Sequence, residues 1–465
     1  MLTKLYEKIK RAPNTITNMI IRIVFVPLRI QAIKISRSIY NNHVQSNKIL
    51  GRVFHYLIYI QRKKADEIRA FSYKKTAKDL AHKNRLNVLF FVEFESSWKI
   101  DSVYQEMNKN PRFNPIVIIC PVVNYGRDNM IKRLDNAFEY FQKKGYRVYR
   151  SYDKKTGLYI DVSERFSPDI IFYTNPYEEL VDSRYHITNF SQILSCYVAY
   201  GYNNIATPDN YALPFHNLLW RFYLENESIK KYYESNLGIH RLNHKVVGYP
   251  PFDDMINRIS SEKESKYKYV IWAPHHTLEA DFNGLLHRNS FLWLSDFMVK
   301  MAEKYNNNLF IIFRPHPLLK NKLYNHSDWG AEKTESYYHL WASMENTLLS
   351  ENRDYIDDFS LSDAMVHDCD SFTVEYIYTE KPVLFSGNRP ERNTLVPSAN
   401  EAFDCYQFAN DEQGVEVFIR DLINGKTDDF LQKKKEFKKK YLIAPNNKTA
   451  AQNIVNDIAD SIWNN

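Results

Sequence analysis

Two short apolar runs, at residues 269–273 and 309–313, most constrain what this chain can fold into. They read YVIWA and LFIIF, β-branched and aromatic without polar alternation, which predicts strands buried on both faces. Residues 291–304 between them have apolar positions at helical spacing. A strand, a helix and a strand in this order form a right-handed crossover, so we expect an open parallel sheet covered by helices.

Both runs stop at histidine beside proline, the first in PHHT and the second in RPHP. Ligands of open parallel sheets bind beyond the carboxyl ends of the strands, so we expect His275, His276, Arg314 and His316 to line a site there. Neighbouring side chains on an extended chain point to opposite faces. Only one of the two adjacent histidines is therefore expected to face the site, and we favour His276.

A third polar group, DCDSFTVEY at residues 368–376, lies between a predicted strand and a predicted helix. Free backbone N–H groups and the helix dipole make the start of a helix suited to a phosphate. Together with the fixed charge of Arg314, this group predicts a diphosphate site. Alternatively, an acidic or hydroxyl side chain of the group only caps the helix. The candidate binding residues are Asp370, Ser371, Phe372 and Thr373.

Strands alternate with helices along most of the chain, which predicts an α/β protein with two doubly wound, Rossmann-like domains. Strands are expected near residues 86–92, 114–120, 146–149, 169–173, 195–199, 245–247, 355–356, 364–367 and 382–385. The predicted domain boundaries are a helical arm at 1–83, an N-terminal domain at 84–256, a C-terminal domain at 257–446 and a last helix at 447–465 that crosses back.

The arm is strongly basic. Residues 1–80 hold 17 Lys and Arg against four Asp and Glu, a net charge of +13, whereas the whole chain carries +7 and the remainder therefore −6. With its interspersed apolar residues, the arm is expected to lie on an anionic membrane surface. The alternative is a helical hairpin packed on the body. Nucleic acid is not expected as a partner, because no RNA- or DNA-binding module follows the arm.

Neither a cofactor nor a metal is predicted. Glycine is scarce, at 12 residues, and neither GxGxxG nor GxxxxGK[ST] occurs. The four cysteines are far apart without a CxxC pair, which fits a reducing compartment and no structural zinc site. A metal held by the histidines would need a nearby carboxylate, such as Glu279 or Asp281. No secretory signal is expected, and the apolar residues 19–35 are interrupted by charge and proline and do not predict a membrane span.

The strand ending in APHHT, the strand ending in RPHP and the DSFTVEY…KPVLF block together resemble the CDP-glycerol glycerophosphotransferase family, which includes teichoic acid polymerases and capsule-synthesis proteins. The resemblance is clearest over residues 245–385. It implies the GT-B fold, with two Rossmann-like domains facing a cleft. It also implies that the C-terminal domain binds the cytidine diphosphate part of a CDP-glycerol or other CDP-polyol donor.

By this resemblance, Arg314 and His316 hold the diphosphate, with Ser371 and Thr373 at the following helix start. We predict catalytic roles for His316, His276 and Glu375, the last at a place where the family often has an acidic residue. One departure matters. The family's N-terminal domain usually has a His-Gly pair after a central strand, but residues 200–204 here read YGYNN. The general base is therefore unassigned, with Asp209, His216 and Glu95 as possible substitutes.

The implied reaction moves glycerol phosphate to a hydroxyl of a growing, lipid-linked surface glycan and releases CMP. The alternatives are a GT-B glycosyltransferase that uses a nucleotide sugar, or a non-catalytic subunit of a capsule-assembly complex. The expected location is the cytoplasm, peripheral to the inner face of the cell membrane. An oligomer is possible.

Overall fold

The computed structural model describes residues 48–259, 265–278, 289–351 and 354–464. The first part of the predicted arm, residues 1–47, lies outside this range, as do Glu279 and Asp281. The chain forms two compact units. The first comprises the chain up to Gly201, Pro208–Pro250 and the chain from Ala444, and the second comprises Tyr202–Thr207 and Pro251–Ile443. The longer segment of the second unit begins at Pro251.

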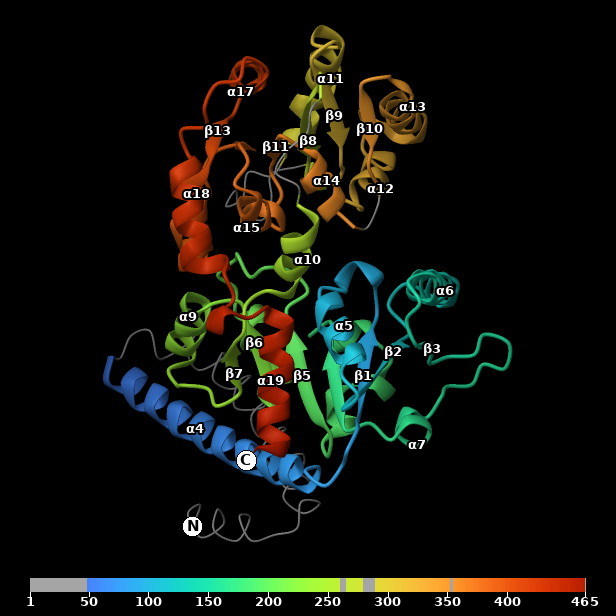
Figure 1. The fold of residues 1–465 in the computed structure, drawn as a ribbon, viewed down its shortest axis with the longest axis vertical. Coiled ribbons are helices and arrows are strands. Elements are labelled where there is room, and N and C mark those ends of the chain that lie inside the picture. Colours follow the sequence, from blue (N-terminus) through green and yellow to red (C-terminus); the bar gives the residue numbers. More distant parts are fainter. Residues whose placement is uncertain (1–47, 260–264, 279–288, 352–353, 465) are drawn as a thin grey trace. The chain divides into compact units, whose positions relative to one another are not determined.

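The first unit is built on a parallel sheet of seven strands in the order β3-β2-β1-β4-β5-β6-β7 (Figure 1). Its strands are β1 (Leu86–Val92), β2 (Phe113–Ile119), β3 (Val148–Arg150), β4 (Ile170–Tyr173), β5 (Leu194–Val198), β6 (Arg221–Leu224) and β7 (His244–Val246). Its helices are α4 (Lys48–Asp79), α5 (Asp101–Lys109), α6 (Arg127–Lys143), α7 (Val162–Phe166), α8 (Pro214–Leu218), α9 (Glu227–Leu237) and α19 (Ala450–Trp463).

The second unit has a parallel sheet of six strands in the order β10-β9-β8-β11-β12-β13. Its strands are β8 (Lys268–Ala273), β9 (Leu309–Phe313), β10 (Thr347–Leu349), β11 (Ala364–His367), β12 (Val383–Ser386) and β13 (Gln407–Ala409). Its helices are α10 (Pro250–Arg258), α11 (Ser290–Lys304), α12 (Leu319–Tyr324), α13 (Gly330–Ser343), α14 (Ile356–Leu361), α15 (Phe372–Glu375), α16 (Pro397–Ala402), α17 (Glu412–Ile423) and α18 (Leu431–Phe437).

Each sheet is wound outward from its middle. In the first unit the chain leaves β1 for β2 and β3, then returns to β4 on the other side of β1. In the second unit it leaves β8 for β9 and β10 and returns to β11. The strand order therefore reverses between β1 and β4 and again between β8 and β11. These are the two switch points at which doubly wound sheets bind ligands.

The apolar runs form the predicted buried strands. In β8 the residues from Val270 to Ala273 are at 0% exposure, and in β9 so are Leu309, Ile311, Ile312 and Phe313. Sequence patterns missed β6, β10 and β13, whose three or four residues are too short to show a period. The strand predicted at residues 355–356 is wrong. Tyr355 is the N-cap of α14, and its apolar neighbours are the buried side of that short helix.

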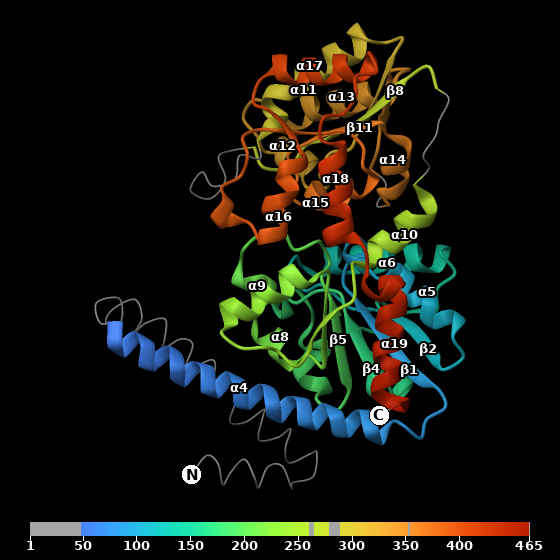
Figure 2. The same cartoon turned by 60° about the vertical axis from the view of Figure 1, so that its left-hand side comes forward.

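The helix α4 packs on the first unit through the side that faces the sheet. Ile68, Tyr73 and Ala77 are buried, and the Tyr73 hydroxyl lies 3.1 Å from Ser195 Oγ and donates to the Leu218 carbonyl at 2.5 Å. The last helix, α19, belongs to the same unit, as Figures 1 and 2 both show. It starts at a capping box formed by Thr449 and Gln452.

The junction between β7 and α19 depends on Gly248. Its φ is +98°, and a Cβ atom built there would lie 2.6 Å from Ala444 Cβ and 3.2 Å from Ala450 Cβ. Glycine is therefore required twice, once for its backbone conformation and once because the C-terminal segment approaches so closely.

We expect Gly248→Ala to lower the free energy of unfolding by about 2–4 kcal/mol, because left-handed strain adds to overpacking. Chemical denaturation followed by circular dichroism measures this loss. The control is Gly238→Ala, where φ is +71° but nothing lies within 4 Å of the added atom, so that only about 1 kcal/mol is expected. Equal losses in the two variants would contradict the close approach.

Candidate functional site

The second unit brings the two histidine motifs together at its switch point. His275 and His276 follow β8, and His316 follows the neighbouring β9. The ring centroid of His316 lies 5.2 Å from that of His275 and 4.3 Å from that of His276, and one ring nitrogen from each of the three lies within 4.8 Å of the others. The predicted convergence at this sheet edge is thus confirmed.

The expectation that only one of the adjacent histidines faces this group is wrong. The rings of His275 and His276 lie side by side, with centroids 4.1 Å apart and planes inclined by 31°. The chain bends at His276 instead of continuing as a strand. Alternation of side chains holds only for extended backbone, so both rings can turn to the same side.

A buried carboxylate, Asp368, fixes the loop that carries these rings. It follows β11 directly and is 0% exposed. Its Oδ1 accepts a hydrogen bond from the His275 backbone N–H at 2.6 Å, and its Oδ2 accepts one from the Ser290 N–H at 2.9 Å. Burial raises its pKa. The sequence patterns did not single this residue out, although a carboxylate placed directly after a strand at a switch point was the available signal.

Backbone hydrogen bonds assign the proton of two rings. Nδ1 of His316 accepts from the Leu318 N–H at 3.1 Å, and Nδ1 of His275 accepts from the Thr277 N–H at 3.3 Å. In a neutral ring the proton is then on Nε2, which becomes a hydrogen-bond donor. Burial, with a smaller effect of neighbouring charges, lowers the pKa of His316 to about 3, so this ring is neutral near pH 7.

Three histidines are the number of ligands in some catalytic zinc sites, so the chemistry of this donor set decides what it can hold. A metal ligand must offer a lone pair. The Nε2 atoms of His275 and His316 instead carry protons while Nδ1 accepts from the backbone. Binding a cation would break these backbone hydrogen bonds, whereas the N–H groups suit the oxygens of an anion.

Arg314 lies at the same edge but is already engaged. Its Nη1 donates to Asp358 Oδ2 at 2.6 Å and to Ser350 Oγ at 2.9 Å. Its charge is therefore balanced within the fold by a largely buried carboxylate. Its predicted contact with a diphosphate stays a prediction, and the ion pair would fix the direction of the guanidinium.

The group after β11 is divided between surface and interior. Ser371 is exposed at the N-cap position of α15, and Asp370 is half-buried. Thr373 is buried, and its hydroxyl donates to the Cys369 carbonyl at 3.2 Å. The helix α15 has only four residues, so the dipole assumed from the sequence is weak. Of this group, Ser371 has the exposure that the predicted contact with a phosphate requires.

The half-buried Phe372 and the buried Glu375 pack the one-turn helix against α14 and its N-cap. Phe372 lies with its ring centroid 5.2 Å from that of Phe359 and 5.4 Å from that of Tyr355. Glu375 is at 0% exposure and accepts a hydrogen bond from the Tyr355 side chain. A catalytic role for Glu375 stays a prediction that its interior position does not favour.

The segment in place of the expected His-Gly pair has a structural role in the second unit. Asn204 is 3% exposed, and its side-chain amide donates to the Asp370 carbonyl at 2.6 Å. Its own carbonyl accepts from the Val396 N–H at 2.9 Å. Asn204 thus supports the loop before α15. Sequence reasoning noted this segment only for the histidine it lacks.

Of the substitute bases, His216 is the least suited. It is 1% exposed, and burial lowers its pKa to about 3. Asp209 is exposed, and Glu95 is half-buried on a short 3₁₀ turn at Glu95–Ser97.

The first unit has an acidic group at its own switch point that the sequence analysis did not name. Glu93 follows β1 and is 4% exposed, and its Oε2 lies 2.9 Å from the hydroxyl of Thr174, which follows β4. Burial raises the pKa of Glu93 to about 7. A carboxyl that titrates near neutral pH has the property that a general base requires.

A comparison of the sequence with protein-family models identifies the family of this chain. Residues 220–459 match the family model described as CDP-Glycerol:Poly(glycerophosphate) glycerophosphotransferase, and this range contains the three histidines, Arg314 and the group after β11. The chain belongs to this family. The resemblance inferred from APHHT, RPHP and DSFTVEY is confirmed.

One relative of known name is the teichoic acid ribitol-phosphate polymerase TarL of Staphylococcus aureus (strain NCTC 8325 / PS 47). It is 24% identical over 181 residues, which cover 37% of this chain and 29% of TarL. The chain therefore matches less than a third of the length of that relative.

Solved structures show the fold. A variant of the wall teichoic acid polymerase TagF soaked with CDPG has a TM-score of 0.55 at 14% identity, covering 89% of this chain and 98% of that one. The S. aureus MnaA–UDP co-structure has a TM-score of 0.52 at 14% identity, with 81% and 96% covered. These likenesses confirm the GT-B fold predicted from the sequence.

Glu93 should make stability depend on pH. Its folded-state pKa is raised from 4.5 to about 7, so its contribution to stability is complete below pH 4.5 and is lost as pH rises through 7. The loss should approach about 3 kcal/mol. We expect Glu93→Gln, which mimics the protonated carboxyl, to match the wild type at pH 5 and to unfold at a higher temperature than it at pH 8.

Thermal unfolding between pH 5 and pH 8 measures this difference, with Glu95→Gln as the control for removing a nearby but less buried carboxyl. Parallel curves for the wild type and Glu93→Gln across this range would show that Glu93 is ionised in the folded protein.

Proposed function

We propose that this chain transfers a polyol phosphate, glycerol phosphate in the first instance, from a CDP-activated donor to a hydroxyl of a growing capsule or teichoic-acid-like glycan. The observation that carries this proposal is the cluster of three histidines at the switch point of the second unit, inside the range that matches the family. The Nε2–H groups of His275 and His316 suit the oxygens of a diphosphate.

The reaction requires one bond to form and one to break. The acceptor hydroxyl oxygen attacks the β-phosphorus of the donor, and the bond from that phosphorus to the bridging oxygen breaks, so that CMP leaves. The hydroxyl proton passes to a base. No covalent enzyme intermediate is needed, because positioning and charge stabilisation are sufficient for phosphoryl transfer.

The structure sharpens the role proposed for the histidines. With a pKa of about 3, His316 is not protonated near pH 7 and cannot deliver a proton as an imidazolium. It acts instead as a preorganised hydrogen-bond donor to the phosphate oxygens on which charge develops. His275 has the same tautomer and adds a second donor, and His276 lies between them in the cluster.

The test of the reaction is CMP formation. Purified full-length chain with CDP-glycerol and a glycan acceptor bearing terminal glycerol phosphate is expected to release CMP and to lengthen the acceptor. CDP-ribitol serves as the second polyol donor, and UDP- and CMP-sugars serve as nucleotide-sugar controls. Sugar transfer without CMP release from any CDP-polyol would identify a glycosyltransferase, and no transfer from any donor would favour a non-catalytic subunit.

The histidine cluster is tested by His316→Ala. Losing one preorganised donor should lower kcat by about 10²–10³-fold. The matched control is His339→Ala on α13, an exposed histidine outside the cluster, for which kcat within twofold of wild type is expected. Steady-state CMP release measures both. Unchanged kcat in His316→Ala would remove the cluster from the reaction.

A position at the inner face of the cell membrane is also proposed. Its support is the net charge of +13 in residues 1–80, which anionic lipids attract. Among the described helices, none is both long and apolar enough to cross a membrane. A lipid-linked acceptor would be reached from this surface.

A further inference from the structure

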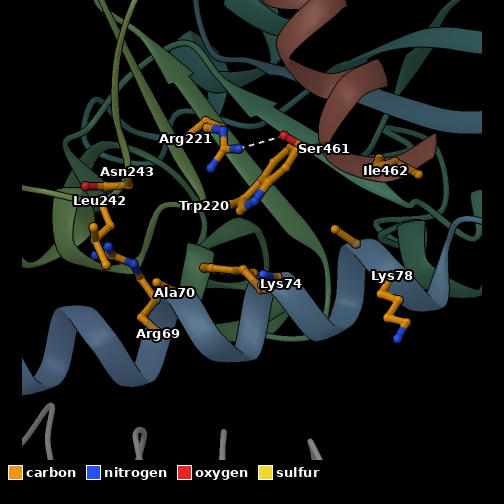
Figure 3. A pocket seen from close by; sticks show the side chains of 12 residues that line it. Arg69, Ala70, Lys74, Lys78, Trp220, Arg221, Leu242, Asn243, Ser461 and Ile462 are labelled. Carbon is orange, nitrogen blue, oxygen red and sulfur yellow. Dashed lines mark hydrogen bonds between the residues drawn. The ribbon is translucent and has the colours of Figure 1, made fainter. Parts of the chain in front are cut away.

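A cavity lies in the first unit, at the amino-terminal edge of the sheet and thus at the edge opposite its switch point. Its volume is about 390 Å³. Figure 3 shows the side chains that line it. The walls come from α4, from the residues that begin β6 and precede β7, and from the end of α19. The lining includes Arg69, Ala70, Lys74 and Lys78 of α4, Trp220 and Arg221 at β6, and Ser461 and Ile462 of α19.

All the charged side chains that line this cavity are cations. Arg221 donates from Nε to Asp457 and from Nη2 to Ser461, each at 2.7 Å, and its guanidinium lies 4.4 Å from the centre of the Trp220 ring. These contacts hold the arginine in one orientation and leave Nη1 without a hydrogen bond to the described residues. The close-up shows the bond to Ser461 beside the Trp220 ring (Figure 3).

The α4 side supplies further cations. Arg69 is 6% exposed and pairs with Asp66, but its Nε is buried without a hydrogen-bond partner among the described residues. Lys74 and Lys78 are exposed and form no ion pair with any residue that the structure describes. Since Asp457 and Asp66 balance the two arginines, the two lysines leave the cavity with a net positive charge.

The cavity is larger and more apolar than a simple anion needs. Trp220, Ala77 and Ile462 are buried and form apolar wall beside the cations. A phosphate with an attached glycerol and the first carbons of an acyl chain would use both kinds of wall. The exposed side of α4 next to the cavity is also basic, because Lys63 and Lys75 are exposed there.

We propose that this cavity binds the phosphodiester headgroup of an anionic membrane lipid, with Arg221 and Lys74 holding the phosphate and the apolar wall receiving the glycerol end. This rests on the membrane position in the proposed function. It adds a defined, saturable site to what would otherwise be general attraction between a basic surface and a membrane. The site lies at the edge of the sheet opposite Glu93.

The test uses the full chain and sedimentation with vesicles of phosphatidylcholine, alone or with 30% phosphatidylglycerol. Lys74→Gln removes a cation that lines the cavity, and Lys75→Gln removes its exposed neighbour, which does not. If the chain bound vesicles by surface attraction alone, both variants would lose the same affinity for the vesicles, roughly fivefold for one basic side chain. We expect binding by Lys74→Gln to be at least fivefold weaker than binding by Lys75→Gln.

Ala70→Leu separates volume from charge, because it fills the cavity and leaves every cation in place. Vesicle binding at least fivefold weaker than wild type is expected, with an unchanged circular dichroism spectrum. Equal losses in the two lysine variants, or wild-type binding by Ala70→Leu, would overturn the site. The site would also be overturned if millimolar inorganic phosphate released the protein from the vesicles as effectively as soluble short-chain phosphatidylglycerol does.

These measurements contain no nucleotide donor, so they stand apart from the CMP assay. Failure of CMP release would leave the lipid result intact, and failure of the lipid result would leave the transfer reaction intact.

Discussion

The hydrogen bonds to the buried carboxylate of Asp368 are the interaction on which the histidine-bearing edge of the second unit depends. This carboxylate accepts the backbone N–H of His275 on one oxygen and that of Ser290 on the other, and so joins the ends of β11 and β8 to the start of α11. Two N–H donors offset the cost of burying this group, and removing it would leave both donors unsatisfied. The hydrogen bond from the His275 N–H to Asp368 holds the bend that turns His275 and His276 to the same side.

The same edge would serve the proposed phosphate site without relying on free positive charge. Arg314 is the one guanidinium in the histidine motifs, and Asp358 neutralises it. Burial keeps His316 neutral near pH 7 by lowering its pKa, and the Nδ1 atoms of His275 and His316 accept hydrogen bonds from the backbone. Fixed N–H dipoles need no reorganisation when charge develops on a phosphate, which favours them over mobile cations in a partly enclosed site.

The first unit separates its chemistry between opposite edges of one sheet. Glu93 and Thr174 meet at the carboxyl edge, between the strands where the winding reverses. Cations and apolar side chains gather at the amino edge, beneath α4. A parallel sheet allows this separation because all strands run in the same direction, so residues that precede strands and residues that follow them are kept a strand length apart.

The sequence by itself determined the two wound sheets, most of their strands and the meeting of the histidine motifs, because buried strands and the carboxyl-edge rule are local or topological. It did not determine which polar groups would be buried. Asn204 and Glu93 were missed and the anchoring role of Asp368 was not foreseen, while Thr373 and Glu375, whose site roles stay predictions, are buried. Burial, tautomer and pKa depend on neighbours distant in the chain, so only the tertiary structure decided them.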